Sequence, residues 1–243
     1  MAEGTFIVRI KRQQRPDEAV RWEEYELRYR PHLNIITCLR DIAEKPYTRD
    51  GRESTPVSYD ANCLEEICGA CAMLINGYPR QACSALVDNL EKPIRLEPLA
   101  KFPLVRDLVV DMAPLAEQTA RVGGAFVPAA GPPTAARIGR DAAERRRIDP
   151  AIECIGCGMC MSACTMVAND PRFPGPAALN RLFTLEEDSR DVGHPERAAV
   201  MLSEDALTRC HTQANCTDVC PMEISPTQSI LALRRRAARR LFS

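Results

Sequence analysis

The chain has 243 residues, enough for one large domain or two ordinary ones, and its 32 basic and 33 acidic side chains give a net charge of −1. A charge this close to zero predicts no affinity for nucleic acid through bulk electrostatics. No stretch approaches the 18 apolar residues that a membrane-spanning helix needs, and no apolar signal segment opens the sequence, so we expect a soluble protein that faces the cytoplasm.

The first part of the chain predicts strands and one helix. Residues 5–11 and 22–29 are rich in β-branched and aromatic side chains, which favours strands. The apolar spacing after Asn34 predicts a helix with Asn34 as its N-cap and a stop at Pro46. Residues 46–62 are polar and contain turn-forming residues, so they predict a loop.

A hairpin is predicted beyond this loop. An apolar strand from Ala72 leads into Asn76-Gly77, a dipeptide typical of tight hairpin turns, and the chain then returns toward Cys83. Residues 94–99 predict one more short strand. Up to about Asp111 the pattern therefore indicates a compact mixed sheet with one helix.

The composition changes after Asp111. Residues 112–150 are rich in Ala, Pro, Gly and Arg, and they predict helical pieces joined by a surface loop that includes Pro128 to Pro133. Beyond Cys154 we expect short helices around cysteine-bearing loops, ending in a helix from about Thr227. We place the domain boundary near residue 112.

The twelve cysteines are many for this length, and in a chain expected to face the cytoplasm they favour metal ligation over disulfides. The first group has the spacing C-x4-C-x2-C-x11-C and consists of Cys63, Cys68, Cys71 and Cys83. Its first three members reproduce the plant-type [2Fe–2S] spacing. Gly69 and Ala70 suit such a loop, because backbone amides must approach the sulfurs closely. A zinc site is the alternative, which the four-residue gap and the distant fourth cysteine disfavour.

Two later runs keep the rhythm that holds cubane clusters in bacterial ferredoxins. The first run is complete, with Cys154, Cys157, Cys160 and Cys164. The second run has Gln213 where a thiolate belongs, between Cys210, Cys216, Cys220 and the closing Pro221. In two-cluster ferredoxins the fourth cysteine of each run ligates the other cluster. We therefore predict a [4Fe–4S] site formed by Cys154, Cys157, Cys160 and Cys220.

The other cluster of this pair would have three thiolates, from Cys164, Cys210 and Cys216. A neutral amide oxygen is a poor ligand for this iron, so Gln213 predicts a [3Fe–4S] cluster. The alternative keeps a fourth iron bound by water or by Gln213. Because cluster type and charge affect the potential, we expect a higher potential here than at the neighbouring cluster. Eleven cysteines then serve three clusters, and Cys38 is left as a small buried apolar residue.

The remaining candidates lie outside the cysteine sets. His211 follows a predicted ligand; it is either hydrogen-bonded near the cluster or helps to seat or protonate an electron acceptor. His32 and His194 are expected in polar surface loops. Residues 230–241 form a basic amphipathic helix, for which a solvated face is the default and contact with anionic lipid or an acidic partner the alternative. The sequence contains no catalytic triad and no dinucleotide fingerprint, so we expect no catalytic residues.

A plant-type domain followed by a two-cluster domain resembles the iron–sulfur subunits of succinate dehydrogenase and fumarate reductase, over essentially the whole chain. The resemblance rests on both later cysteine runs and on residues 62–71 (NCLEEICGAC), 93–99 (PIRLEPL) and 105–108 (VRDL). It implies an α+β architecture. A β-grasp plant-type [2Fe–2S] ferredoxin domain would span residues 1–112, and an α-helical bacterial-type two-cluster domain residues 113–243.

The resemblance also implies a function. A flavoprotein with covalent FAD would oxidise succinate, and electrons would pass through [2Fe–2S], [4Fe–4S] and [3Fe–4S] to a quinone at a membrane-anchor cytochrome b that holds heme b. This would place the chain in the tricarboxylic acid cycle and the respiratory chain, peripherally bound at the cytoplasmic face of the bacterial inner membrane.

The subtype differs from many ubiquinone-linked members, which have a proline after the cysteine equivalent to Cys164 and a tryptophan nearby. Here Thr165 follows, and residues 165–169 contain no tryptophan, so of that quinone pocket only His211 matches by position. The sequence looks more like the menaquinone-linked enzymes with a diheme cytochrome b. A fumarate reductase subunit and a free ferredoxin-like carrier are the alternatives.

Overall fold

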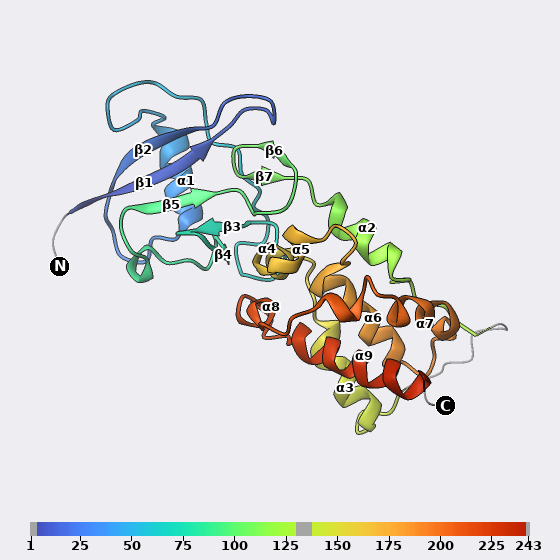
Figure 1. The fold of residues 1–243 in the computed structure, drawn as a ribbon. Helices are drawn as coiled ribbons and strands as arrows, with labels where there is room; N and C mark the ends of the chain where they lie inside the picture. The colour runs from blue at the N-terminus through green and yellow to red at the C-terminus, as the bar shows by residue number, and fades with distance from the viewer. Residues whose placement is uncertain (1–3, 130–137, 242–243) are drawn as a thin grey trace. The chain divides into compact units, whose positions relative to one another are not determined.

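The computed structural model describes residues 4–129 and 138–241, and the chain divides into two compact units. Residues 1–112 and 157–162 form the first unit, and residues 113–156 and 163–243 form the second. The expected α+β class is confirmed, because the strands belong to the first unit and most helices to the second (Figure 1). Residues 157–162, expected from the sequence in the helical domain, belong to the first unit.

The main sheet of the first unit has five strands in the order β2-β1-β5-β3-β4 within residues 4–129. The strands are β1 (Thr5–Arg12), β2 (Arg21–Arg28), β3 (Ala72–Ile75), β4 (Tyr78–Gln81) and β5 (Ile94–Glu97). Strand β1 pairs in parallel with β5, and the other neighbouring pairs are antiparallel. A short helix η1 (Val87–Asn89) precedes β5, and the strands β6 (Leu104–Arg106) and β7 (Val109–Val110) form a separate hairpin.

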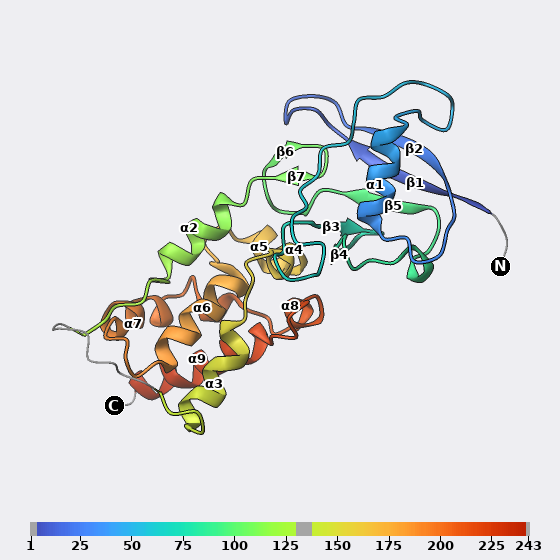
Figure 2. The ribbon, with the colours of Figure 1, turned by 180° about the vertical axis from the view of Figure 1, so that it is seen from behind.

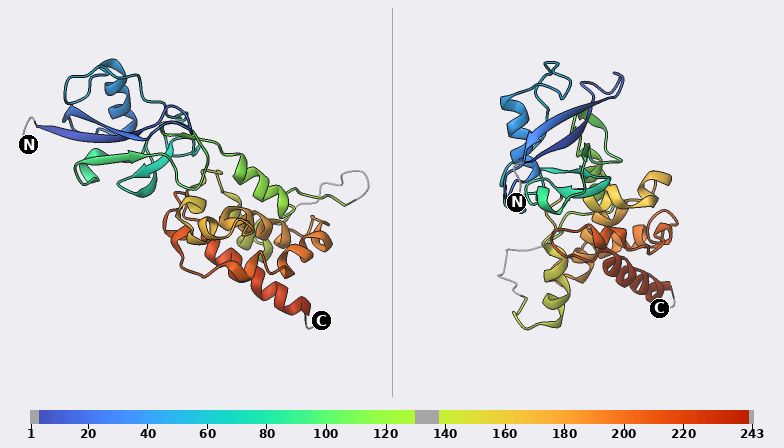
Figure 3. Two further views of the ribbon diagram at one scale, coloured as in Figure 1. Left: turned by 45° about the horizontal axis from the view of Figure 1, so that its top comes forward. Right: turned by 90° about the vertical axis from the view of Figure 1, so that its left-hand side faces the viewer.

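Helix α1 (Ile35–Glu44) lies on one face of this sheet (Figure 3). As predicted, Asn34 is its N-cap and accepts the Thr37 N–H at 2.8 Å. Alternate residues of β1 and the apolar face of α1 share one core. Cys38 is fully buried in that core, and burial raises the pKa of its thiol to about 12, so the expected apolar role is what the structure shows.

The inward alternation of β1 ends on Arg12, which is fully buried. Its guanidinium donates to Asp107 Oδ1 at 3.1 Å, to the Tyr25 hydroxyl at 2.9 Å and to the Glu23 carboxylate. Burial by itself lowers the pKa of Arg12, but the hydrogen bond and charge of Asp107 outweigh it and raise that pKa. The buried cation is therefore compensated by two carboxylates.

Asp107 also orders the backbone around it. Its carboxylate accepts the N–H of Gln13 at 3.1 Å and the N–H of Ser58 at 3.0 Å. Gln13 directly follows β1, and Ser58 lies in the loop that leads to Cys63. One carboxylate thus joins the end of β1, the β6–β7 hairpin and the segment before the first cysteine group.

The second unit is built around α6 (Gly175–Glu187) (Figure 2). Packed against it are α2 (Ala113–Arg121), α3 (Ala143–Ile152), α7 (His194–Leu202) and α9 (Pro226–Leu241). The cysteines of the two later runs lie in or beside short helices. In this unit these are α5 (Thr165–Asn169), η2 (Leu207–Arg209) and α8 (Asn215–Asp218), whereas α4 (Met159–Ala163) lies mostly in the first unit. Of the predicted loop from Pro128 to Pro133, residues 130–133 lie outside the described residues.

A buried carboxylate connects three helices of this unit. Glu186 of α6 is 1% exposed and contacts Arg197 of α7 at 3.2 Å and both Arg236 and Arg240 of α9 at 3.2 Å. His194 Nδ1 lies 3.1 Å from the same carboxylate. His194 begins α7 and is half-buried, so its expected place in a polar surface loop is wrong; the carboxylate of Glu186 holds it against α6. His32, in contrast, is exposed in a turn, as expected.

The basic C-terminal helix also differs from the expected solvated face. Arg236 and Arg240 bond to Glu186, and Arg234 bonds to the loop that carries Cys210. Arg235 and Arg239 remain exposed. The arginines of α9 therefore lie on two faces of the helix, because residues four apart share a face. Arg236 and Arg240 pack the helix onto its unit, and Arg235 and Arg239 face solvent.

We predict that Asp107→Asn lowers the free energy of unfolding of the first unit by about 3 kcal/mol, because it weakens the compensation of a buried guanidinium. Unfolding is followed by the fluorescence of Trp22, the single tryptophan of the chain, in a urea titration. Asp17→Asn removes an exposed carboxylate near Arg15 and should cost less than about 1 kcal/mol. Equal effects of the two substitutions would contradict the proposed weight of Asp107.

Candidate iron–sulfur cluster sites

The loop around Cys63 directs backbone N–H groups at one sulfur. The Sγ of Cys63 accepts the N–H groups of Glu65 at 3.4 Å, Ile67 at 3.4 Å and Cys68 at 3.3 Å. The Glu65 N–H, then the Cys68 thiol and the Ile67 N–H, lower the pKa of Cys63 to about 7. These bonds favour the thiolate, which is the form that binds iron.

The β3–β4 hairpin brings Cys71 and Cys83 together. Ala72 pairs with Gln81 in the ladder, and the Ala82 N–H donates to the Cys71 carbonyl at 3.1 Å. The turn has the predicted Asn76-Gly77 pair, with φ of 54° and 79°, as a tight hairpin turn requires. Burial and the adjacent Cys83 thiol raise the pKa of Cys71 to about 11.

Gln81 connects the Cys63 loop with this hairpin. Its Nε2 donates to the Glu66 carbonyl at 3.1 Å, and its Oε1 lies 4.0 Å from Cys71 Sγ. Ser84 donates to the Glu66 carboxylate at 2.7 Å. The structure thus gathers the four cysteines of the first group in one part of the first unit. Sequence reasoning missed Gln81, because nothing in its spacing distinguishes it from an ordinary strand residue.

Gly69 is placed where no side chain fits. Its φ is +75°, and a Cβ there would lie 2.7 Å from the Cβ of Cys157. The first cysteine loop therefore touches the segment that carries Cys157, within the first unit. The neighbour of Gly69 is a cysteine of the second group. The approach of its own backbone amide to a sulfur stays a prediction from the sequence.

Cys164, Cys210 and Cys216 lie together in the second unit. Burial raises the pKa of the Cys216 thiol, the Thr227 hydroxyl at 3.4 Å lowers it, and Cys164 and Cys210 raise it through their charges. The Sγ of Cys210 also accepts the N–H of Thr212 at 3.4 Å. The structure thus brings together the three thiols predicted to hold one cluster.

Arg234 of α9 fixes the loop that carries Cys210. It donates to the Leu207 carbonyl at 2.7 Å, to the Thr212 hydroxyl at 3.2 Å and to the Cys210 carbonyl. Thr212 has φ of 59°, a left-handed backbone that is unusual for a β-branched residue. Sequence reasoning missed Arg234, because it belongs to a run of arginines that looks like a surface stripe.

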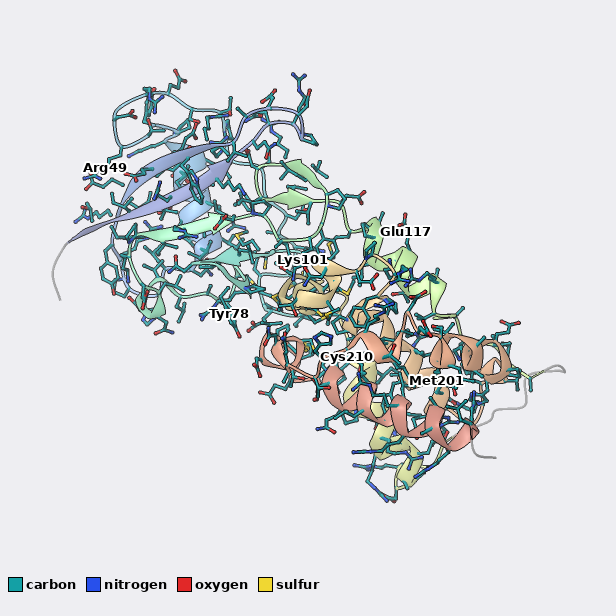
Figure 4. All side chains as sticks on the ribbon, in the orientation of Figure 1. Arg49, Tyr78, Lys101, Glu117, Met201 and Cys210 are labelled. Carbon is teal, nitrogen blue, oxygen red and sulfur yellow. The ribbon has the colours of Figure 1, made fainter. Side chains whose placement is uncertain are left out.

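Gln213 is exposed, and its amide oxygen accepts the Thr165 hydroxyl at 2.8 Å. His211 is exposed beside Cys210, the residue labelled in Figure 4, and its imidazole makes no hydrogen bond within the described part of the chain. The two alternatives for His211, a hydrogen bond in the shell of the cluster and a role in seating or protonating an electron acceptor, both stay predictions.

The four cysteines predicted to hold the [4Fe–4S] cluster belong to different units. Cys157 and Cys160 belong to the first unit, and Cys154 and Cys220 belong to the second, so their grouping stays a prediction from the spacing. None of the twelve cysteines, all of which lie within the described ranges, forms a disulfide. Thiols approached by backbone N–H groups, with a glycine at the closest approach, are the donor set that iron–sulfur clusters need, and the residues fit these groups.

Two further searches concern the described residues only. Within residues 4–129 and 138–241, no three His, Cys, Asp or Glu side chains converge as ligands of a single metal ion. Over the same ranges no helix combines the length and the apolar character needed to cross a bilayer.

Two family models match the chain. One describes a 2Fe-2S iron-sulfur cluster binding domain and matches residues 7–117, and the other describes a 4Fe-4S dicluster domain and matches residues 150–224.

Individual proteins are similar over nearly the full length. The succinate dehydrogenase iron-sulfur subunit of Bacillus subtilis is 41% identical over 93% of this chain and 90% of its own. The fumarate reductase iron-sulfur subunit of Escherichia coli O6:H1 is 32% identical over 85% of this chain and 82% of its own. A chain of the Mycobacterium smegmatis Sdh1 complex in the apo form has the same fold, with a TM-score of 0.86 at 24% identity over 100% of this chain and 99% of that one.

We predict that Gly69→Ala reduces the [2Fe–2S] content severely, because the new Cβ collides with Cys157 in addition to straining the backbone. Gly51→Ala is the matched control: its φ is +81° with no atom within 4 Å, so it should cost only the strain of about 1 kcal/mol. The measurements are iron content and the EPR signal of the reduced [2Fe–2S] cluster. If both variants keep the same content, the contact with Cys157 does not constrain the loop.

Proposed function

Because the chain belongs to the family of iron–sulfur subunits of succinate dehydrogenase and fumarate reductase, we propose that it carries electrons from a succinate-oxidising flavoprotein to a quinone. The observation that carries this proposal is the group of three thiols, Cys164, Cys210 and Cys216, with Gln213 where a fourth thiolate would stand. The Bacillus subtilis relative, a succinate dehydrogenase subunit, supports oxidation of succinate as the physiological direction.

Eleven cysteines are proposed to hold three clusters. The [2Fe–2S] ligands are Cys63, Cys68, Cys71 and Cys83. The [4Fe–4S] ligands are Cys154, Cys157, Cys160 and Cys220. The [3Fe–4S] ligands are Cys164, Cys210 and Cys216. When bound, these clusters supply one-electron redox groups; the chain itself offers no site for succinate in the proposal.

The residues of the chain hold these groups and limit their surroundings. Backbone N–H groups at Cys63 stabilise negative charge on the sulfur, as does the Thr212 N–H at Cys210. Contact between Gly69 and Cys157 keeps the first two cysteine groups close, which favours electron transfer between them.

The proposed domains are residues 1–112 and 113–243. The division of the chain into compact units supports the boundary, since the main segment of the first unit ends at Met112 and the second unit begins at Ala113. Residues 157–162 are the exception, because they belong to the first unit.

The proposed partners are a flavoprotein with covalent FAD and a membrane-anchor cytochrome b with heme b. They would place the chain peripherally at the cytoplasmic face of the bacterial inner membrane. Thr165 and the lack of tryptophan in residues 165–169 favour menaquinone and a diheme anchor over the ubiquinone-linked subtype.

His211 is proposed to lie near the quinone. It follows a proposed cluster ligand, is exposed, and forms no hydrogen bond within the described residues, so its ring is available to an external acceptor. An imidazole can donate, accept and transfer a proton, which reduction of a quinone requires.

A fumarate reductase subunit is the second candidate, supported by the Escherichia coli relative, and a free ferredoxin-like carrier is a third. Purification from membranes separates the carrier from both complexes, because only a subunit co-isolates with a flavoprotein and a cytochrome b. The rates of succinate-driven quinone reduction and quinol-driven fumarate reduction then decide the direction. The isolated chain should show neither activity.

We predict that EPR redox titration of the intact complex finds three clusters. The oxidised complex should show the paramagnetic [3Fe–4S] signal, with a higher potential than the [4Fe–4S] cluster because the two differ in iron content and charge. A diamagnetic oxidised site at these three cysteines would exclude the three-iron assignment.

We predict that Gln213→Cys converts this site toward [4Fe–4S], because it restores the missing thiolate. The oxidised EPR signal should disappear and the iron content should rise by about one atom per chain, as the added iron of a four-iron cluster requires. Gln228→Cys, an exposed position on α9, controls for the added thiol and should leave the signal unchanged.

A further inference from the structure

The hydrogen bond between Thr165 and Gln213 joins the two segments that carry the three thiols. Thr165 directly follows Cys164, and Gln213 lies in the loop between Cys210 and Cys216. The Thr165 hydroxyl donates to the amide oxygen of Gln213 at 2.8 Å. The bond therefore involves the side chain that stands in the sequence position of the missing fourth thiolate.

The backbone on both sides of Gln213 is left-handed. Thr212 and Ala214 have φ of 59° and 64°, and Arg234 binds the Thr212 hydroxyl at 3.2 Å. Rotation about the side-chain bonds of Gln213 can move its amide without a change in this backbone. The bond to Thr165 selects one of these positions.

The amide oxygen is the one donor atom that Gln213 can offer to iron, because its nitrogen carries two hydrogens. A weak oxygen ligand competes poorly with thiolates, so a further constraint on its position decides whether it can bind at all. We propose that Thr165 is a positioning residue that holds the Gln213 amide and withholds its oxygen from a fourth iron. This proposal rests on the proposed function, since it requires the [3Fe–4S] cluster at these cysteines.

The test measures iron uptake by the intact complex. Dithionite supplies one electron to the oxidised three-iron cluster, giving [3Fe–4S]⁰, which takes up Fe²⁺ to give [4Fe–4S]²⁺. The new iron binds three cluster sulfides and needs a fourth ligand from the protein or water. Conversion is titrated with Fe²⁺ under argon, and the remaining [3Fe–4S] is measured by EPR after reoxidation and by Mössbauer spectroscopy.

Thr165→Val removes the hydroxyl and keeps the shape of the side chain. The Fe²⁺ concentration at half conversion should fall about fivefold, which corresponds to about 1 kcal/mol, the contribution of one hydrogen bond. Thr165→Ser keeps the hydroxyl and should behave like the wild type. An unchanged midpoint in Thr165→Val, or the same shift in Thr165→Ser, overturns the proposal.

A double substitution tests whether Thr165 acts through Gln213. In Gln213→Leu there is no amide oxygen to release, so adding Thr165→Val should leave the midpoint unchanged. A shift of the same size in that background would show that Thr165 acts by another route and would overturn the proposal. If the wild-type complex lacks the oxidised [3Fe–4S] signal, the cluster assignment fails and this inference with it; a signal without a shift rejects the inference alone.

Discussion

Arginine side chains hold the loops that present the cysteines, since these loops contain little regular structure of their own. In the first unit Arg12 and Asp107 fix the segment that leads to Cys63. In the second unit Arg234 holds the Cys210 loop through backbone carbonyls and a hydroxyl. A planar guanidinium suits this task, because its five N–H groups can bind several acceptors in fixed directions. The positions of the Cys63 and Cys210 loops therefore depend on charges that lie outside the cysteine motifs.

Sequence spacing predicted the parts of the structure that depend on local pattern. The strands, the Asn34 cap and the hairpin turn follow from alternation, side-chain hydrogen bonding and φ preference, which act over a few residues. The contacts of His194, Arg234 and Thr165 could not be predicted in this way. Thr165 and Gln213 lie 48 residues apart, and their bond exists only after both loops are in place. The inward position of Arg12 matches the alternation of β1, but its charge would favour an outward direction. The buried carboxylates of Asp107 and Glu23 resolve that conflict.

One segment that carries two proposed cluster ligands belongs to a different unit from its neighbours in the sequence. Residues 157–162 lie far beyond the sheet in sequence, yet they pack with the first unit, against Gly69. A proposed ligand of the second cluster is in this way part of the folding unit of the first. The two cysteine groups are therefore coupled mechanically, because a change that disorders the Gly69 loop displaces the segment that carries Cys157.

The β3–β4 hairpin explains the number of residues between Cys71 and Cys83, which the coordination of iron does not determine. Cys71 and Cys83 flank a pair of four-residue strands, so the number of residues between them, eleven, is set by the length of this hairpin. Iron binding requires only that the two sulfurs lie close together at the open end of the hairpin. Lengthening both strands equally would move the turn outward and leave the open end in place, whereas adding one residue to a single strand would turn one sulfur to the opposite face. Natural variation in this interval should accordingly occur in steps of two.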